Sequence, residues 1–264
     1  MKLPRFNFWG LFWGTLALLY FFVPMYGTLD FSLRMQKGLI SLRAYQIVLA
    51  DPQFVESFLY SVTMGVITVI VSILIFMPTT YWIYLKLPKL RPLVEIITIL
   101  PFIIPVIVYV FGLIRTFSRP PFLLTLSPLG TDFLIAGGYV ILSMPYMFRA
   151  IDVGMRAIDV RTLTEASQSL GGNWLQTLVN VILPNLRVAL LSGSLITFAT
   201  VIGELILADF LFRPAFGPYM TSIGTTKAYE PAALTIMSFA LTWICLGIIQ
   251  LISRGDTSQQ LTGR

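Results

Sequence analysis

The chain has 264 residues, 56% of them hydrophobic and 11% charged. Soluble domains carry charge on about a quarter of their residues, so this composition excludes that class and indicates a membrane protein. The formal net charge of +6 comes from Lys and Arg scattered between apolar runs rather than gathered in a basic patch, so we expect no nucleic-acid partner.

Ligand chemistry is restricted by the absence of histidine and by a single cysteine, Cys245. These counts remove the usual zinc and haem ligand sets and any disulfide within the chain. We therefore expect no metal site in this chain.

Apolar runs of roughly 20 residues, enough to cross hydrocarbon, organise the whole sequence. Three runs are free of charge, two contain one acid each (Glu95 and Glu204), and one lies between Asp132 and Arg149. We predict an all-α membrane protein in which residues 1–264 form one transmembrane domain with six helices. The predicted spans are residues 6–29, 57–85, 93–114, 133–150, 188–208 and 231–253.

The distribution of basic residues predicts the orientation of these spans. Lys2 and Arg5 precede an apolar run that is long and lacks a clean small-x-small cleavage site, so we expect an uncleaved first span rather than a signal peptide. The short loop Lys86–Arg91 carries three basic residues, and such loops stay in the cytoplasm. Both termini are then predicted to be cytoplasmic.

Two prolines fall inside the third predicted span, at Pro101 and Pro105. Each removes a helix hydrogen bond and clashes with the preceding turn, so the helix must be distorted there. A broken helix within a membrane is tolerated where it lines a cavity, which makes a hinge or gate one interpretation. A static kink that suits helix packing is the other.

Residues 156–184 form the one long polar segment on the predicted cytoplasmic side. Thr162 and Glu165 have the spacing of a capping box and predict the start of a short helix, although Asp159 or Asp152 is an alternative cap. Gly171 is expected to end that helix in a left-handed conformation.

A second short helix is expected directly after this turn. Asn173 and Gln176 repeat the capping-box spacing, and the helix would run toward Pro184. The segment is therefore predicted to be a polar helix-turn-helix.

Glu204 lies within the fifth predicted span. An ionisable group in a span is costly unless it faces water, a partner or a ligand, so Glu204 is a candidate for a substrate path and could attract a cation. The alternatives are a structural hydrogen bond or salt bridge, and a position just outside the hydrocarbon. Asp209 is a weaker candidate for the same path.

The polar segment resembles the loop signature of importer permeases of the ABC transporter class. The signature reads Glu-Ala-Ala, three residues, Gly, nine residues and Ile-x-Leu-Pro; here it is Glu165-Ala166-Ser167, Gly171 and Val181-Ile182-Leu183-Pro184. Ser167 and Val181 depart from the strict form by conservative changes. The resemblance covers about Tyr60 to Ser253, and the stretches Asp152–Asp159 and Val201–Glu204 look like the spermidine/putrescine-type subfamily, second permease subunit.

This resemblance implies the type I importer permease fold, with a cytoplasmic coupling helix between spans four and five. It also implies a bacterial inner membrane location, two cytoplasmic ATP-binding subunits that hold ATP and Mg, a second permease subunit and an extracytoplasmic solute-binding protein. The chain itself contains no phosphate loop of the Gly-x-x-x-x-Gly-Lys-Ser/Thr type, in agreement with a non-catalytic role.

The same resemblance assigns roles to the residues of the signature. Glu165 is expected either to pair with an ATPase subunit or only to cap its helix, and Ala166 and Gly171 to allow close approach. Pro184 is expected to end the second helix and to set the direction of the fifth span. For Leu170 and Leu183 a contact inside the hairpin is favoured over one with the ATPase.

The expected function is therefore ATP-driven import of a small cation such as a polyamine, by alternating access. Import of another solute, such as iron, a phosphonate or a thiamine-like molecule, is an alternative within the same class. A self-contained secondary carrier is an alternative from a different class, but it has no need of the helix-turn-helix. An intramembrane enzyme is disfavoured because clustered acids and a nucleophile-base pair are missing.

Overall fold

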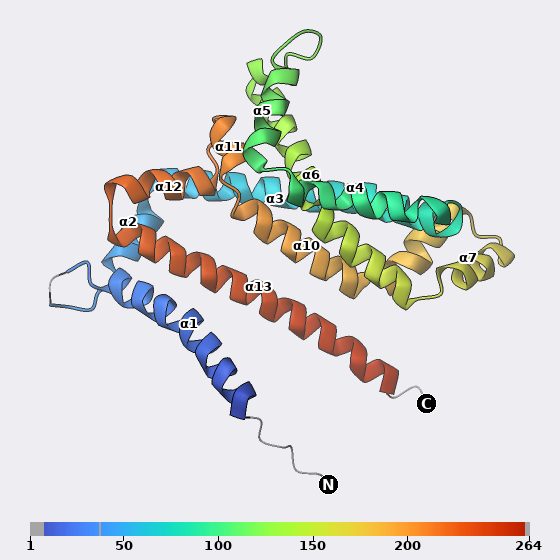
Figure 1. Ribbon diagram of the computed structural model, residues 1–264, viewed down its shortest axis with the longest axis horizontal. Coiled ribbons are helices and arrows are strands. Elements are labelled where there is room, and N and C mark those ends of the chain that lie inside the picture. The colour runs from blue at the N-terminus through green and yellow to red at the C-terminus, as the bar shows by residue number, and fades with distance from the viewer. Residues whose placement is uncertain (1–7, 37, 262–264) are drawn as a thin grey trace. The chain divides into compact units, whose positions relative to one another are not determined.

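The computed structural model describes residues 8–36 and 38–261, and every regular element in them is a helix (Figure 1). The expected all-α class is confirmed. The first elements are α1 (Phe8–Leu33), α2 (Arg43–Ala50), α3 (Pro52–Leu85), the 3-10 turn η1 (Pro88–Leu90), α4 (Arg91–Ile103), α5 (Val106–Phe117), η2 (Leu124–Leu126) and α6 (Pro128–Ala157). They are followed by α7 (Val160–Ser169), α8 (Trp174–Thr177), the π-helical η3 (Leu178–Ile182), α9 (Leu183–Asn185), α10 (Arg187–Ile202), α11 (Ile206–Phe210), α12 (Phe216–Thr226) and α13 (Tyr229–Leu261).

The chain divides into two compact units, which we describe separately. The first comprises residues 1–54 and 220–241, and the second comprises residues 55–219 and 242–264. In the first unit α1 presents apolar side chains on most of its surface, with Trp13 59% exposed. The C-terminal end of α1 is held by a hydrogen bond between Ser32 and Tyr45 (2.7 Å) and by stacking of Phe31 on Tyr229 (4.7 Å between ring centroids).

The number of spans is only partly resolved by helix length and composition. Within the described residues, Trp9–Leu33, Pro52–Leu85 and Pro128–Ala157 are each long and apolar enough to cross a membrane. Two sharply bent helix pairs raise that number to at most five. The predicted sixth span coincides with helix α13, but the predicted count of six is not confirmed. Residues 6–7 of the first predicted span lie outside the described residues.

The third predicted span is broken, as its prolines require. Helix α4 ends at Ile103, Ile104 is extended (ψ 118°), and Pro105 precedes the first residue of α5. The axes of the two halves differ by 98°, and Figure 1 shows α5 turning away from the line of α4. A residue before proline is driven out of the helical region, so Pro105 sets the break, whereas Pro101 lies inside α4.

Two hydrophobic clusters form the core of the second unit. One joins the middle and end of α3 to the end of α6 and to residues 160–190, with Tyr81, Ile151 and Ile182 almost fully buried. The other joins α5, the first half of α6 and α11 through Val110, Ile135 and other buried side chains. Helix α5 thus belongs to the second cluster, whereas α4, all of whose residues are described, contributes to neither cluster and packs against α6.

Helices α6 and α10 approach closely because glycines lie at their crossing. A Cβ atom placed on Gly154 would lie 2.7 Å from the Cβ of Ala189 and 2.8 Å from Cδ2 of Leu186. A Cβ on Gly193 would lie 2.8 Å from that of Ala150. Small residues at such crossings let helix backbones pack tightly in membranes.

Gly154→Ala tests this packing. The added methyl group must push the two helices apart, and overpacking of this kind costs about 1–3 kcal/mol. We expect a lower thermal unfolding midpoint in detergent for Gly154→Ala.

The matched control for this change is Gly112→Ala in α5, where nothing lies within 4 Å of the added carbon. This control should gain up to about 1 kcal/mol from the better helix propensity of alanine. An equal gain from both substitutions would contradict the close crossing.

Candidate functional site

The predicted helix-turn-helix exists as a hairpin over residues 159–185. Its first arm is α7, and its second arm runs from α8 through η3 to α9. The first arm begins earlier than the sequence indicated: Asp159, and not Thr162, is its N-cap. Oδ1 of Asp159 accepts the N–H of Thr162 (3.1 Å), and Oδ2 accepts the Thr162 hydroxyl (2.7 Å).

The turn between the arms follows the prediction. Gly171 has φ +85°, the left-handed conformation that favours glycine. Its N–H donates to the carbonyl of Gln168 (2.9 Å), and the N–H of Gly172 donates to that of Ser167 (2.9 Å), so the helix ends in a Schellman motif. The expected second capping box is also confirmed, with reciprocal hydrogen bonds between Asn173 and Gln176.

The second arm ends one residue after Pro184 and turns sharply into α10. Residues 178–182 adopt π-helical geometry that ends two residues before Pro184, which has no N–H to donate to the preceding turn. The axis changes by 79° between Trp174–Asn185 and Arg187–Ile202. Pro184 therefore lies in the last turn before the bend.

The inner face of the hairpin is built into the core of the spans. Val160 and Thr164 are buried on one side of α7, and the Thr164 hydroxyl forms a hydrogen bond with that of Tyr81 in α3 (3.2 Å). Ser167 and Thr177 join the two arms through their hydroxyl groups (2.9 Å). Val160 and Tyr81 belong to the hydrophobic cluster that also contains the end of α6, so the hairpin is packed against both α3 and α6.

The outer face of the hairpin carries most of the predicted coupling residues. Glu165 is 64% exposed and pairs with Arg161 one turn earlier (2.9 Å), so it does not reach back to Thr162 as a capping box requires. Ala166 is exposed beside it, and Leu183 is 36% exposed on the other arm.

Leu170 corrects an expectation. The sequence favours a contact inside the hairpin for this side chain, but the structure leaves it 90% exposed at the end of α7. The Schellman turn places Leu170 at its apex, where no other part of the hairpin can cover it. Trp174, Leu175 and Val179 on the second arm are also about half exposed, so an apolar surface surrounds the turn.

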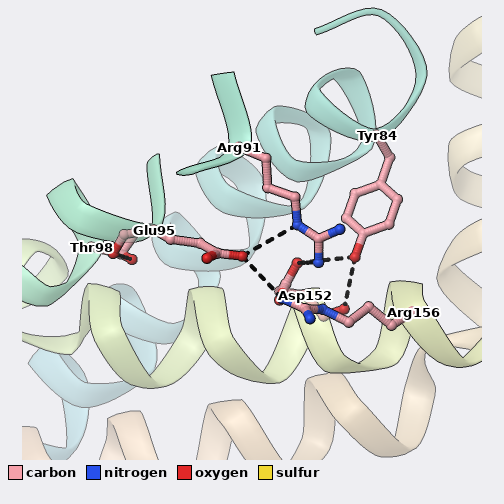
Figure 2. A network of polar contacts seen from close by, with 6 residues as sticks. All are labelled: Tyr84, Arg91, Glu95, Thr98, Asp152 and Arg156. Carbon is pink, nitrogen blue, oxygen red and sulfur yellow. Dashed lines mark hydrogen bonds and ion pairs between the residues drawn. The ribbon is translucent and has the colours of Figure 1, made fainter. Parts of the chain in front are cut away.

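A polar cluster lies where α6 meets the hairpin, and Figure 2 shows its members. Asp152 of α6 is central, with its side chain 3% exposed. Its Oδ1 accepts Nη2 of Arg91 (3.1 Å) and the hydroxyl of Tyr84 (3.0 Å), and its Oδ2 accepts Nε of Arg156 (2.9 Å). Glu95 of α4 joins both guanidinium groups, at 3.3 Å from Arg91 and 3.0 Å from Arg156.

The sequence marks Asp152 as a possible helix cap and as part of a subfamily-like stretch, but it does not predict this cluster. Two pairs at i,i+4 spacing, Arg91 with Glu95 and Asp152 with Arg156, were the available signal. Their meeting depends on the packing of α4 against α6, which the spacing alone cannot predict. A cavity of about 250 Å³ adjoins the cluster between these two helices.

A second polar cluster lies at the other end of α3 and α6. Asp132 accepts the hydroxyl of Tyr60 (2.6 Å) and pairs with Arg213 (2.7 Å), whose guanidinium also lies over the Tyr60 ring. Phe212, the residue before Arg213, has φ +53° and is 92% exposed. Because Tyr60 belongs to α3 and Asp132 to α6, the contacts of Arg213 attach the loop after α11 to both helices.

The two candidate path residues lie beside a break in the fifth predicted span. Helix α10 ends at Ile202, and both carboxylate oxygens of Glu204 accept the N–H of Leu207 at 3.0 Å, so Glu204 caps α11. Its side chain is partly exposed, and Asp209 is exposed in α11. Gly217 is needed here, since a Cβ atom would lie 2.5 Å from the Glu204 carbonyl oxygen. In the part of the chain that the structure describes, no three His, Cys, Asp or Glu side chains are placed to hold a metal ion.

Comparison with known proteins decides the family. Residues 47–255 match the family model described as "Binding-protein-dependent transport system inner membrane component". The chain belongs to this family. The expected resemblance to importer permeases is thereby confirmed, and the matched region contains the whole hairpin and both polar clusters.

Curated relatives are identical to this chain at about a quarter of the aligned positions. The Spermidine/putrescine transport system permease protein PotB of Escherichia coli (strain K12) is 27% identical over 175 residues, which cover 62% of this chain and 63% of that protein. The PotB homolog of Mycoplasma genitalium is 27% identical over 227 residues, 82% of this chain and 79% of that protein. The match thus spans somewhat less than two thirds of the length of the Escherichia coli protein.

Solved structures confirm the fold. A chain of a bacterial ABC transporter involved in the import of the acidic polysaccharide alginate matches with a TM-score of 0.66 at 18% identity, covering 94% of this chain and 99% of that chain. A chain of an alginate ABC transporter in complex with an alginate pentasaccharide-bound periplasmic protein matches with a TM-score of 0.70 at 15% identity, covering 94% of each chain. At these identities the likeness establishes the importer permease fold alone.

The cap of α7 makes a pH-dependent prediction. The hydrogen bonds from the hydroxyl and the N–H of Thr162 hold the pKa of Asp159 below its ordinary value. The cap therefore contributes fully above the ordinary aspartate pKa of about 3.9, and this contribution is lost as the pH falls through the lowered value. Amide hydrogen exchange of α7 should lose protection over that range.

Two variants separate the charge of this cap from its hydrogen bonds. Asp159→Asn keeps an acceptor for the N–H of Thr162 and should remove the pH dependence while retaining protection at neutral pH. Asp159→Ala should lose protection at every pH. Protection of α7 in Asp159→Asn that falls with pH as it does in the native chain would contradict the assignment.

Proposed function

We propose that this chain is a permease subunit of an ATP-driven importer and that its cargo is a small cation, most simply a polyamine. The observation that carries the proposal is the two-sided hairpin: its inner face is built into the core of the spans, and its outer face presents exposed apolar and charged groups. A surface of this kind suits a partner that moves the spans from outside the membrane.

The proposed partners are two cytoplasmic ATP-binding subunits, which bind ATP and Mg, a second permease subunit and an extracytoplasmic solute-binding protein. The chain itself would catalyse no reaction. We place it in the bacterial inner membrane with both termini in the cytoplasm, in agreement with the inner membrane family and with the basic loop Lys86–Arg91.

The outer face of the hairpin is the proposed contact with the ATPase. Leu170 would enter an apolar groove, because it is exposed at the apex and lies next to other half-exposed apolar side chains. Glu165 and Ala166 would lie along the same contact, and Gly171 would hold the apex in shape through its left-handed conformation. Leu183 and Pro184 would act at the base, where the hairpin turns into α10.

Alternating access supplies the proposed mechanism. Closure of the ATPase subunits on ATP would displace both hairpins of the permease pair and open the path outward, and hydrolysis would reset it. The break around Pro101 and Pro105 is the proposed hinge, because Ile104 is extended and the helix axis changes by 98° there.

Glu204 and Asp209 are the proposed contacts on the substrate path. Glu204 retains a partly exposed carboxylate while it caps α11, and Asp209 is exposed five residues later. Their negative charge suits a cationic cargo, which agrees with the cargo named for PotB of Escherichia coli.

Leu170→Asp tests the docking surface. Loss of a buried leucine contact costs about 1.5–3 kcal/mol, which corresponds to docking that is roughly tenfold or more weaker. Because Leu170 is almost fully exposed in the isolated chain, the variant should fold normally. We expect co-purification with the ATPase subunits and transport-linked ATP hydrolysis to fall together.

The matched control for Leu170→Asp is Leu126→Asp, which places the same change at another exposed leucine, in η2. This variant should retain assembly with the ATPase. Normal assembly and transport in Leu170→Asp would remove the hairpin apex from the interface.

Glu204→Gln tests the substrate path. The glutamine keeps a carbonyl acceptor for the Leu207 N–H but removes the negative charge, so the spermidine concentration for half-maximal uptake should rise, by about fivefold or more for a charge-assisted contact. Glu204→Ala removes both the hydrogen-bond acceptor and the negative charge. Comparison of the two variants therefore separates the helix-capping role of Glu204 from a contact with the substrate. If uptake is normal in Glu204→Gln and impaired only in Glu204→Ala, Glu204 is a helix cap and not a substrate contact.

A further inference from the structure

Asp152 connects three helices at the point where the hairpin begins. Its carboxylate is held by Tyr84 from the end of α3, by Arg91 from the start of α4 and by Arg156 from its own helix (Figure 2). We call Tyr84, Arg91, Glu95, Asp152 and Arg156 the Asp152 cluster. The side chain of Asp152 is buried, unlike that of an ordinary exposed ion pair. Removing one cationic partner would therefore leave a buried negative charge uncompensated, which is costly.

The cluster lies directly beside the hairpin along the chain. Arg156 is in the last turn of α6, which ends at Ala157, and α7 begins three residues later at Val160. Met155 and Val160 are both buried in the hydrophobic cluster that holds the hairpin. Through the end of α6, a displacement of the hairpin would therefore act on the Asp152 cluster.

The cluster also fixes the near half of the broken helix. Arg91 and Glu95 hold the start of α4 to α6, and the ring of Phe102 packs edge-on against that of Tyr146 (5.3 Å between centroids) to hold its end. Helix α4 is thus attached to α6 at two levels, one on each side of the cavity between them.

The far half of the broken helix belongs to a different packed region. Val110 of α5 is buried with Ile135 and Leu207, and Phe111 packs against Phe210 of α11 (5.1 Å between ring centroids). The break at Ile104 is the link between the two regions.

We propose that Asp152 is a positioning residue for energy coupling, which fixes α4 to α6 so that a movement of the hairpin is delivered to α4 and absorbed at the Ile104–Pro105 break. This inference rests on the proposed function and adds the route by which the hairpin acts on the spans. A residue that only stabilised the fold would lower every activity in proportion to the amount of folded protein.

The test uses the complete transporter, with its ATPase subunits, second permease and solute-binding protein, in proteoliposomes. Spermidine uptake and ATP hydrolysis are measured together, and the result is the number of molecules transported per ATP hydrolysed. Asp152→Asn should leave hydrolysis stimulated by the binding protein and lower this ratio about fivefold or more. Tyr84→Phe, which removes one hydroxyl group, should lower it in the same direction by less.

The control variant for charge loss is Asp30→Asn in α1, which removes an exposed pair with Arg34 just after that helix and should leave the ratio unchanged. If Asp152→Asn fails to assemble, Tyr84→Phe carries the test alone. If a folded variant, Asp152→Asn or Tyr84→Phe, transports as many molecules per ATP as the native complex, the inference is overturned.

A chemical bridge supplies the second arm of the test. Phe102→Cys and Tyr146→Cys, combined with Cys245→Ser, place two thiols at a contact between α4 and α6. If these helices move together, joining the thiols with a short bifunctional reagent should leave native transport intact and should restore the ratio in Asp152→Asn. Cleavage of the bridge should reverse that rescue.

Two results of the bridging experiment overturn the inference. Transport blocked by the bridge in an otherwise native chain would show that α4 and α6 must separate during the cycle. Uptake and hydrolysis that fall in equal proportion in Asp152→Asn, with no rescue by the bridge, would show a purely structural role. Failure of the proposed function is distinct, because the native complex would then show no ATP-dependent uptake at all.

Discussion

The burial of the inner face of the hairpin in the core of the second unit is the constraint on which the other features depend. Val160, Leu178 and Ile182 of the hairpin share one hydrophobic cluster with Tyr81 of α3 and Ile151 of α6. A polar connection that touched the spans only at its ends could move without effect on them. Here, removing apolar surface from water holds the hairpin to two long helices at once, so force applied to its outer face reaches the spans.

Charge reinforces this attachment where apolar packing ends. Asp152 is buried and is compensated by two guanidinium groups and a tyrosine hydroxyl, which come from three different helices. Such a cluster adds little net stability compared with apolar packing, but breaking it by removing one partner is costly. It therefore ties α3, α4 and α6 together at one point. At the opposite end, Asp132, Tyr60 and Arg213 do the same for the loop after α11.

Local signals in the sequence were reliable where the deciding physics is local. Gly171, Asn173 and Gln176 adopt the expected turn and capping box because these hydrogen bonds join residues within one or two turns of one another. Pro105 broke its helix for the same reason. The first cap was placed three residues late because Asp159 and Thr162 both satisfy the local pattern, and the carboxylate prevailed by accepting two hydrogen bonds from Thr162.

The sequence by itself determined the membrane class, the helical composition, the position of the hairpin and its family signature, because composition, apolar run length and short-range spacing carry that information. Only the tertiary structure decided which side chains meet across helices. It placed Leu170 at an uncovered apex, turned Glu204 toward the backbone of α11, and assembled Asp152 with Arg91 across 61 positions of the chain. Those contacts depend on how helices cross, and the crossing of α6 with α10 is set by glycines whose importance appears only when their neighbours are in place.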